Sequence, residues 1–392
     1  MDQIHGVRAP TGTRSATLLQ VYDVAVIGAG PAGTAAALRV LRDRPASRVL
    51  LLDPATFPRD KVCGDGIAAA VFDLLAALGA AGLEELAPPV PRLRLRTPRG
   101  RTVERACARA NRVIPRVVFD AALVDAALDR GAELRRHRVR MLQARPDGVE
   151  IDGRFAARTV VGADGANSTV RRLLGAPALP PASLALALRG YAPASPDPDR
   201  MTIEFAPGPY PAYAWSFPLA DGRANVGYGV FDRRGSGNRQ AYLDALHTLL
   251  PGQEPEPSTV RGHHLPLSTG PRFHPDGRVL LAGDAAATIN PLTGEGIFDA
   301  VASGALAGRA ALLGAGAGVA HRTAMRRSFG RHYRHSAAMA RLTMRPAFLD
   351  AAVSAASAHR SVFDAAVRLG LERGTVPPAA LALILAHLVG RR

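Results

Sequence analysis

The sequence predicts an α/β fold in which a parallel sheet with its helices is joined to an antiparallel sheet and followed by C-terminal helices. Three observations favour this fold. An apolar strand at Val24–Ile27 runs into a glycine-rich turn and an Ala-rich helix at Thr34–Leu41. Closely spaced strand-like segments follow Leu184, and helical patterns rich in Arg, His and Ala follow Gly330. A strand feeding directly into a helix is typical of a parallel sheet.

The glycine-rich turn has the spacing of a dinucleotide-binding site. Gly28, Gly30 and Gly33 occupy the G-x-G-x-x-G positions. The first glycine allows the tight turn, the second lets the backbone approach a pyrophosphate, and the third lets the helix pack closely on the sheet. Pro31 stands at the start of that helix, whose free N–H groups attract phosphates. A plain strand–helix corner is the alternative interpretation.

An acidic residue follows at the position expected for ribose recognition. The second apolar strand, Arg48–Leu52, ends at Asp53, twenty residues after Gly33. A carboxylate there accepts hydrogen bonds from the two ribose hydroxyls of an adenosine. Because it would repel a 2′-phosphate, the sequence favours FAD or NAD over NADP.

The composition indicates a globular, cytoplasmic protein with room for two cores. The chain has 392 residues, of which 47% are hydrophobic, and no stretch reaches 18 uninterrupted apolar residues, so we expect no transmembrane segment. The polar first 20 residues are expected to form a loose tail, because they lack the apolar region of a signal peptide. Two cysteines, Cys63 and Cys107, cannot build a disulfide framework or a Cys-based zinc site.

The net charge of +16 does not by itself indicate a nucleic-acid partner. Arginine is spread along the whole chain, and we find no basic region interleaved with aromatic residues, so we expect no nucleic-acid binding. Peripheral contact with a membrane is more plausible. The apolar segment Ala379–Val389 is followed by Arg391 and Arg392, and is too short to span a bilayer. It either packs on the protein or lies in a membrane interface.

Two further segments have candidate ligand-binding residues. In the loop Phe57–Ile67, two glycines precede an apolar helix, which suggests a loop pressed against a ligand, with Lys61 available for a phosphate or carboxylate. An ordinary glycine turn is the alternative, and Cys63 is either reactive or an inert packing residue. Arg116 opens a predicted helix that runs to about Arg130, where its charge opposes the dipole. An anionic cofactor would explain it; a solvated arginine is the alternative.

Short strands are predicted in the rest of the chain. A hairpin and two further strands are expected at Pro91–Leu95, Arg101–Glu104, Glu133–Met141 and Gly148–Phe155. The antiparallel sheet is expected from Leu184–Tyr191, Met201–Phe205, Ala212–Phe217 and Ala224–Phe231. Its aromatic residues Tyr213, Trp215 and Phe217 share one face, and either wall an apolar cavity or belong to the core.

Two strand ends carry an aspartate. The strand from Thr159 ends before Asp164, which either binds a cofactor or substrate or caps the turn. The strand Arg278–Leu281 ends before Asp284, which can hold a polyol hydroxyl. Gly294–Gly296 then lets the chain approach a planar ring. The positive end of the next helix points at the same place, an environment that would stabilise the negative charge of a reduced flavin. The alternating glycines at 314–318 follow a helix, so we expect no second dinucleotide site.

Three of these segments, at Gly28–Asp53, Gly162–Gly165 and Gly283–Gly296, together resemble the FAD-binding fold of para-hydroxybenzoate-hydroxylase-type flavoproteins. Within that superfamily the chain is most similar to the geranylgeranyl reductase family over roughly residues 20–320. The features that carry this resemblance are Lys61–Ile67, Arg116–Asp120, Tyr213–Pro218 with Gly227 and Gly229, and Asn290–Ile297.

The resemblance implies a Rossmann-like FAD-binding domain of the GR2/PHBH type, an antiparallel-sheet substrate domain and a C-terminal helical segment. The expected boundaries are 1–19 for the tail, 20–90, 110–182 and 275–325 for the FAD-binding domain, 91–109 and 183–274 for the substrate domain, and 326–392 for the helical region. The residues expected at the cofactor are Gly28, Gly30, Pro31, Ala32, Gly33, Asp53, Lys61, Cys63, Gly64, Asp65, Arg116, Asp164, Gly283, Asp284, Pro291, Gly294, Gly296 and Ile297. The residues expected at the substrate are Tyr213, Trp215 and Phe217.

The family reduces carbon–carbon double bonds of prenyl chains, so the resemblance implies FAD-dependent hydride transfer to an apolar isoprenoid or secondary-metabolite substrate. Cys63 is then the candidate proton donor, and NAD(P)H or an electron-donor protein supplies the electrons. One departure is Asp53, where such proteins more often have Glu. The alternatives are a flavin-dependent monooxygenase or halogenase of the same fold, and a non-catalytic FAD-bearing protein.

Overall fold

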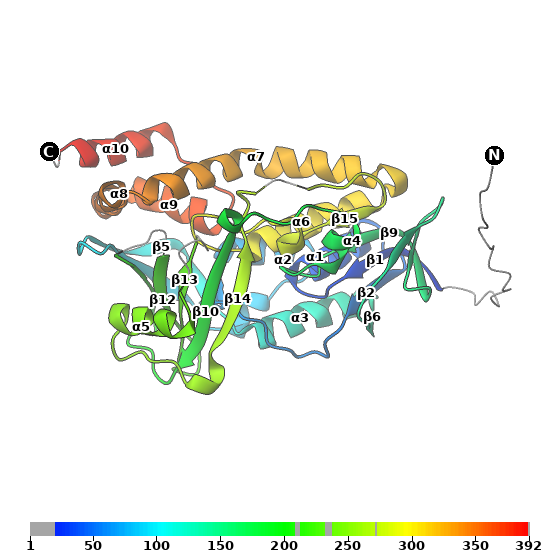
Figure 1. Ribbon diagram of the computed structural model, residues 1–392. Helices are drawn as coiled ribbons and strands as arrows, with labels where there is room; N and C mark the ends of the chain where they lie inside the picture. The colour runs from blue at the N-terminus through cyan, green and yellow to red at the C-terminus, as the bar shows by residue number, and fades with distance from the viewer. Residues whose placement is uncertain (1–19, 208–211, 232–236, 271–272, 391–392) are drawn as a thin grey trace, which may run out of the picture.

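The computed structural model describes residues 20–207, 212–231, 237–270 and 273–390. The predicted tail, residues 1–19, lies outside them. Two sheets and a layer of long helices make up this part of the chain (Figure 1). Both sheets were predicted, and their strands confirm the α/β fold class.

The first sheet is mainly parallel and contains the buried strand of the glycine-rich turn. Its parallel strands are β1 (Gln20–Ile27), β2 (Val49–Asp53), β6 (Glu133–Arg136), β9 (Phe155–Gly162) and β15 (Val279–Leu281). An antiparallel extension is formed by β7 (Leu142–Ala144) and β8 (Val149–Ile151). Val24 and Val26 of β1 are fully buried, because strands lie on both sides of β1 and helices cover the sheet.

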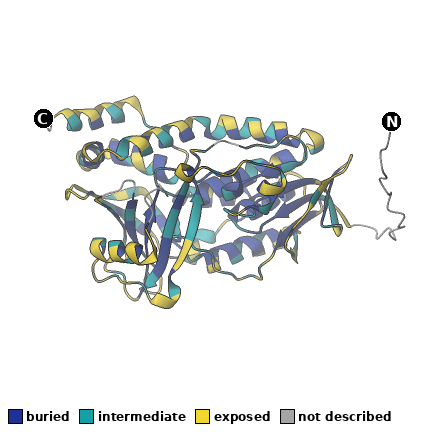
Figure 2. Ribbon diagram, viewed as in Figure 1, coloured by how far each residue is buried: buried dark blue, intermediate teal, exposed yellow. Residues whose placement is uncertain are grey.

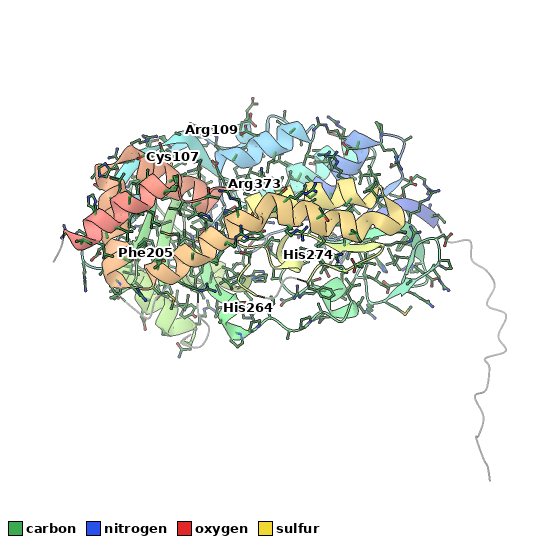
Figure 3. The ribbon with its side chains drawn as sticks, turned by 90° about the horizontal axis from the view of Figure 1, so that it is seen from above. Cys107, Arg109, Phe205, His264, His274 and Arg373 are labelled. Carbon is green, nitrogen blue, oxygen red and sulfur yellow. The ribbon has the colours of Figure 1, made fainter. Side chains whose placement is uncertain are left out.

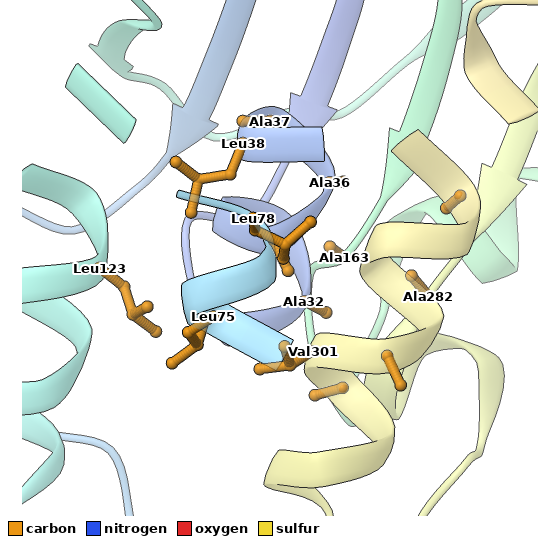
Figure 4. Packing of buried hydrophobic residues seen from close by; sticks show 14 of the residues in the cluster. Ala32, Ala36, Ala37, Leu38, Leu75, Leu78, Leu123, Ala163, Ala282 and Val301 are labelled. Carbon is orange, nitrogen blue, oxygen red and sulfur yellow. The ribbon is translucent and has the colours of Figure 1, made fainter. Parts of the chain in front are cut away.

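Helices α1 (Pro31–Asp43) and α6 (Ile297–Ala311) pack directly against each other beside this sheet. Small residues allow the contact: a Cβ at Gly304 would lie 2.1 Å from the carbonyl oxygen of Ala32, so only glycine fits there. Leu75 of α2 (Ala69–Ala77) and Leu123 of α3 (Arg116–Asp129) belong to the same core (Figure 4).

The first sheet differs from the predicted strands in two places. Strand β6 ends at Arg136, five residues before the predicted end at Met141. The predicted strand Gly148–Phe155 is two strands, β8 and β9, separated by a turn at Asp152 and Gly153 with φ of 52° and 65°. An Asp-Gly pair with both φ values positive makes the tight turn that suits a hairpin, and this turn signal was missed.

The second sheet is antiparallel except for one pair of strands. Its order is β14 (Arg261–Pro266), β10 (Leu184–Ala192), β13 (Ala224–Val230), β12 (Ala212–Pro218), β11 (Arg200–Phe205), β4 (Val90–Arg96), β5 (Thr102–Val113) and β3 (Gly66–Ile67). Strands β4 and β11 pair in parallel, so the predicted hairpin extends this sheet. Helix α5 (Arg239–Leu249) contacts β12 and β13; α5 and β14 were not predicted.

The C-terminal helices of the described residues form a layer over parts of both sheets (Figures 1 and 3). They are α7 (Ala317–Thr343), α8 (Pro346–Ala358), α9 (Arg360–Leu371) and α10 (Pro378–Val389). Helix α7 runs without a break across residues 325 and 326, where the sequence placed a domain boundary. The short helix α4 (Thr169–Leu173) follows β9.

Helix α10 packs on α8 and α9, which is one of the two arrangements considered for the apolar C-terminal segment. Ala380 and Ile384 are buried, whereas Leu385 and Val389 are exposed. Figure 2 shows the exposed residues along the outer side of α10. Within the described ranges, no helix combines the length and apolar character needed to cross a bilayer.

Candidate active site

A cavity of about 720 Å³ is lined by the first sheet, the second sheet and the C-terminal helices. Most of the predicted site residues line it: Gly28, Gly30, Pro31, Ala32, Asp53, Lys61, Cys63, Gly64, Arg116, Asp164, Tyr213, Trp215, Phe217, Asp284, Gly294, Gly296 and Ile297. Four predicted cofactor residues do not line it: Gly33, Asp65, Gly283 and Pro291. The structure therefore brings together motifs that are far apart in the sequence.

The three glycines of the turn have different surroundings. Gly28 has φ of 100°, and a Cβ there would lie 2.3 Å from the carbonyl oxygen of Ala163. A Cβ at Gly33 would lie 1.8 Å from the carbonyl oxygen of Gly28. At Gly30 the nearest atom would be Nη2 of Arg59, 3.5 Å away, so this glycine is open toward the cavity. No side chain caps α1 at Gly30, which leaves its N-terminal donors for an anion.

Asp53 lies on the cavity wall and also fixes the glycine-rich turn. Its Oδ2 accepts a hydrogen bond from the backbone N–H of Ala29, and its Oδ1 accepts one from Ala55, both at 2.9 Å. The short side chain thus binds the adjacent backbone, and each oxygen keeps a lone pair for a further donor.

Arg116 is buried and paired, not solvated. Its Nε and Nη2 donate to the two carboxylate oxygens of Asp120 at 2.6 and 2.8 Å, one helical turn later. Arg59 adds a third contact, with its Nη1 3.0 Å from Asp120 Oδ2. One buried carboxylate therefore holds two arginines at the cavity, and the role of Asp120 was missed because sequence spacing alone does not reveal burial.

Lys61 and Asp284 form an ion pair on the wall, with Nζ 2.9 Å from Oδ2. Burial favours the neutral form of Asp284, but the charge and hydrogen bond of Lys61 outweigh burial and lower the pKa of this carboxyl. His263 of β14, which was not predicted, also lines the cavity. Burial and the charge of Lys61 lower the pKa of His263 to about 4, so its ring is neutral.

Lys61→Met should reduce the free energy of unfolding at pH 7 by about 1–3 kcal/mol, because Asp284 loses its cation in a mostly buried site. The lowered pKa of Asp284 contributes stability above its unfolded value of 3.8, and this contribution is lost as the pH falls through the folded-state pKa. The deficit should therefore shrink below pH 4. Urea unfolding at pH 7 and below pH 4 tests this, with Lys61→Arg as the charge-retaining control. An equal loss of unfolding free energy in Lys61→Met at pH 7 and below pH 4 would contradict the ion-pair explanation.

The loop after Lys61 places a thiol on the cavity wall. Burial raises the pKa of the Cys63 thiol, although the charge of Arg116 acts in the opposite direction, so the group is protonated at neutral pH. The loop packs against the aromatic strand: a Cβ at Gly64 would lie 3.4 Å from Trp215 Nε1 and Phe217 Cε2.

Asp65 does not line the cavity, but it organises the cavity wall. Its backbone is left-handed, with φ of 59°. Its carboxylate accepts hydrogen bonds from Tyr191 Oη at 2.8 Å and Asn225 Nδ2 at 2.7 Å. Burial raises the pKa of Asp65 to about 6, against the opposing charge of Arg189. Asp65 therefore ties the cysteine-containing loop to strands β10 and β13.

Asp164 and Gly283 have roles in local structure. The carboxylate of Asp164 accepts hydrogen bonds from Ser168 Oγ at 2.5 Å and the backbone N–H of Thr169 at 2.6 Å, so it caps α4 while lining the cavity. Gly283 donates to Ser303 Oγ at 2.9 Å and supports the turn behind the wall.

The segment Asn290–Ile297 differs from the expectation of a free helix N-terminus. The backbone N–H groups of Ile297 and Phe298 donate to Glu295 Oε1 at 2.7 and 3.1 Å. The first turn of α6 therefore binds a carboxylate of its own chain. Asn290 Nδ2 donates to the carbonyl oxygen of Leu369 at 2.7 Å and attaches the segment to α9.

The three aromatic residues of β12 line the cavity, as one of the two predicted alternatives proposed. Trp215 donates from Nε1 to Asn225 Oδ1 at 2.9 Å, and the Tyr213 hydroxyl donates to the carbonyl oxygen of Thr293. Gly227 makes room for the indole, because a Cβ there would lie 2.2 Å from Trp215 Cζ2. The ring edges and faces thus form a rigid apolar wall.

The C-terminal helices complete the apolar part of the cavity, and sequence analysis missed this contribution. Their lining side chains include Met339, Leu349, Val353, Val362, Phe363 and Ile384. Seen from above, α8 and α10 lie over the second sheet and α7 extends along α6, with Arg373 beside α7 (Figure 3). The guanidinium of Arg373 lies 5.9 Å from the centre of the Phe329 ring on α7.

Residues 21–197 match the family model described as an FAD binding domain. The chain is 34% identical over 313 residues to digeranylgeranylglycerophospholipid reductase 1 of Methanopyrus kandleri, a match that covers 74% of this chain and 80% of the relative. It is 30% identical to the menaquinone reductase of Mycolicibacterium smegmatis, covering 88% and 90%. The crystal structure of a geranylgeranyl bacteriochlorophyll reductase-like protein from Thermoplasma acidophilum superposes with a TM-score of 0.78 at 21% identity, covering 95% and 98%.

Proposed function

Since the chain belongs to the geranylgeranyl reductase family of FAD-dependent oxidoreductases, we propose that it reduces carbon–carbon double bonds of an apolar isoprenoid or secondary-metabolite substrate. The observation that carries this proposal is that one cavity is lined by both the glycine-rich turn and the aromatic and C-terminal apolar residues. Its relatives are named as reductases of a digeranylgeranylglycerophospholipid and of menaquinone, which supports an isoprenoid-type substrate.

The residues on the wall suit FAD. The uncapped N-terminus of α1 and the open space at Gly30 suit a pyrophosphate, with Arg59 close by. Asp53 is proposed to accept from the adenosine ribose, and Asp284 from the ribityl chain. Gly294, which has φ of 73° and packs on Phe231, allows the backbone to approach the ring system.

FAD in its reduced form supplies a hydride, and the protein residues provide the remaining conditions for the reaction. The aromatic wall and the C-terminal helices orient an apolar chain and exclude water from it. Cys63 is proposed as the proton donor to the substrate, because its thiol is protonated and lies on the cavity wall. Arg116 is held by Asp120, so its charge is fixed beside the thiol.

We propose that NAD(P)H or an electron-donor protein reduces the cofactor. In the described residues, the glycines near residue 314 follow α6 and not a strand, so they do not form a second dinucleotide turn. Peripheral membrane contact is proposed through the outer side of α10, where Leu385 and Val389 are exposed.

The proposed function predicts that an alkene reoxidises the flavin in the absence of oxygen. The purified protein is reduced under nitrogen with dithionite or NADPH, and a polyprenyl substrate is added while the visible spectrum is followed. We expect the flavin absorbance to return with formation of the saturated product, because the double bond accepts the hydride.

The control is the saturated form of the same polyprenyl substrate, which should leave the flavin reduced. If the flavin stays reduced until air enters, and product forms only then, the reaction is that of a monooxygenase or halogenase. If the flavin is never reduced by any donor, the protein is a non-catalytic FAD carrier.

A further inference from the structure

Glu295 stands on the cavity wall between two glycines and has no assigned role. It is half-buried because it faces the cavity. Its Oε1 accepts the hydrogen bonds from Ile297 and Phe298 that begin α6. The carboxylate therefore occupies the positive end of a 15-residue helix that opens on the proposed cofactor site.

Three cations that line the cavity are engaged by other carboxylates. Lys61 pairs with Asp284, whereas Arg59 and Arg116 pair with Asp120. Burial raises the pKa of Glu295 to about 7, while the two backbone donors and the charge of Arg116 lower it and Asp284 raises it further. Both the neutral and the ionised carboxyl are therefore populated near neutral pH.

Charged and titratable groups surround Glu295 from several elements. They are Arg116 of α3, Asp284 after β15, Asp299 of α6, Tyr213 of β12 and Cys63 of the loop before β3. Burial raises the pKa of Asp299, Tyr213 and Cys63. Tyr213 and Cys63, whose ordinary pKa already lies above 7, therefore stay neutral near pH 7. Arg116 keeps its charge through Asp120. Glu295 is thus a group on this wall whose charge changes near pH 7.

We propose that Glu295 takes up a proton when the cofactor bound in this cavity is reduced, and that it holds the proton which, together with a hydride, saturates the double bond. The transfer of this proton to the double bond rests on the proposed function, whereas the uptake of the proton by Glu295 does not. In the balanced reaction the π bond breaks and two C–H bonds form, one from the hydride and one from the proton. The carboxyl O–H bond breaks, directly or through Cys63, and leaves a carboxylate. The two electrons come from NAD(P)H or the donor protein through FAD.

Glu295 is expected to take up a proton because its carboxylate and the reduced flavin are both negatively charged. A reduced flavin is anionic near neutral pH, and a second negative charge on the same wall raises the free energy of the ionised carboxyl. Proton uptake removes this repulsion. A neutral Glu295 also no longer offsets the positive end of α6, which is then available to stabilise the anionic ring. Reduction and protonation therefore favour each other.

The midpoint potential of the bound FAD, measured against pH without any alkene, tests this proposal. A two-electron couple shifts by about 30 mV per pH unit for each proton taken up, since a tenfold change in equilibrium constant corresponds to 29.6 mV. We expect the wild-type slope to rise from one proton to two above about pH 7. Glu295→Gln should keep the one-proton slope throughout. The control is Glu372→Gln, which changes a carboxyl with a raised pKa that does not line the cavity.

A one-proton slope in the wild-type protein over the whole range would overturn the proposal, even if the Glu295→Gln protein failed to bind FAD. The same two-proton slope in wild type and Glu295→Gln would also overturn it. A slope that depends on Glu295 in a protein that reduces no alkene would support proton uptake and reject only the proposed function.

Discussion

Gly33→Ala should lower the free energy of unfolding by about 3 kcal/mol or more, because overpacking against rigid backbone is destabilising. The new Cβ would lie 1.8 Å from the carbonyl oxygen of Gly28 and 3.1 Å from Val26 Cγ1. Neither neighbour can move easily. Val26 belongs to a central strand, and Gly28 has φ of 100° against Ala163. Urea unfolding of the FAD-free protein measures the change.

Gly30→Ala is the matched control three residues earlier. Its Cβ would have no neighbour closer than 3.5 Å, and its φ of −78° suits alanine, so the stability of the FAD-free protein should change little. Its affinity for FAD should fall at least about tenfold, because the methyl group would occupy the approach to the pyrophosphate. An equal loss of stability in both variants would contradict these two roles, in which Gly33 allows close packing and Gly30 allows the backbone to approach the pyrophosphate.

The parts of this protein that the sequence predicted well are those set by local rules. The turn at Gly28–Gly33, the strand end at Asp53 and the alternation that places Tyr213 and Trp215 on one face each depend on neighbouring residues only. The structure confirms both sheets and brings these segments to one cavity. Local spacing was sufficient to predict these features, because the conformational effect of a glycine and the alternation of side chains along a strand each involve only a few neighbouring residues.

The parts that were missed depend on contacts between distant residues. The pairing of Lys61 with Asp284 joins segments 223 residues apart, so spacing could not reveal that the two candidate ligands neutralise each other. Arg116 was expected to face an anionic cofactor, but its first partner is the carboxylate of Asp120 in the same helix. Glu295 lies within the motif Asn290–Ile297, yet its capping of α6 depends on a side-chain rotamer that no sequence pattern encodes.

The contribution of the C-terminal helices to the cavity was the largest omission. The resemblance ended near residue 320, and helical patterns alone do not say which face meets a sheet. In the structure, α8 contacts β5, and both α8 and α9 line the cavity. The apolar side of the site is therefore divided between the second sheet and the last 50 or so residues of the chain, which makes these helices a target for mutation.

Ala352→Trp should reduce kcat/KM for a long apolar substrate about tenfold or more, equivalent to about 1.4 kcal/mol of transition-state stabilisation. Ala352 lies on α8 and lines the cavity, where an indole would occupy the space proposed for the substrate chain. FAD content should not change, because the glycine-rich turn is on a different sheet. Steady-state kinetics and the flavin absorbance of the purified protein measure both.

Ala358→Trp provides the control for this variant, because Ala358 is the last residue of the same helix, is exposed and does not line the cavity. It should keep wild-type kinetics. The loss of kcat/KM in Ala352→Trp should be smaller for a substrate with a short apolar chain than for one with a long chain, since the indole blocks only part of the apolar wall. If the Ala352→Trp protein reduced long and short alkenes as fast as the wild-type protein, the substrate would not bind beneath α8. It would then have to lie along the aromatic strand β12 alone.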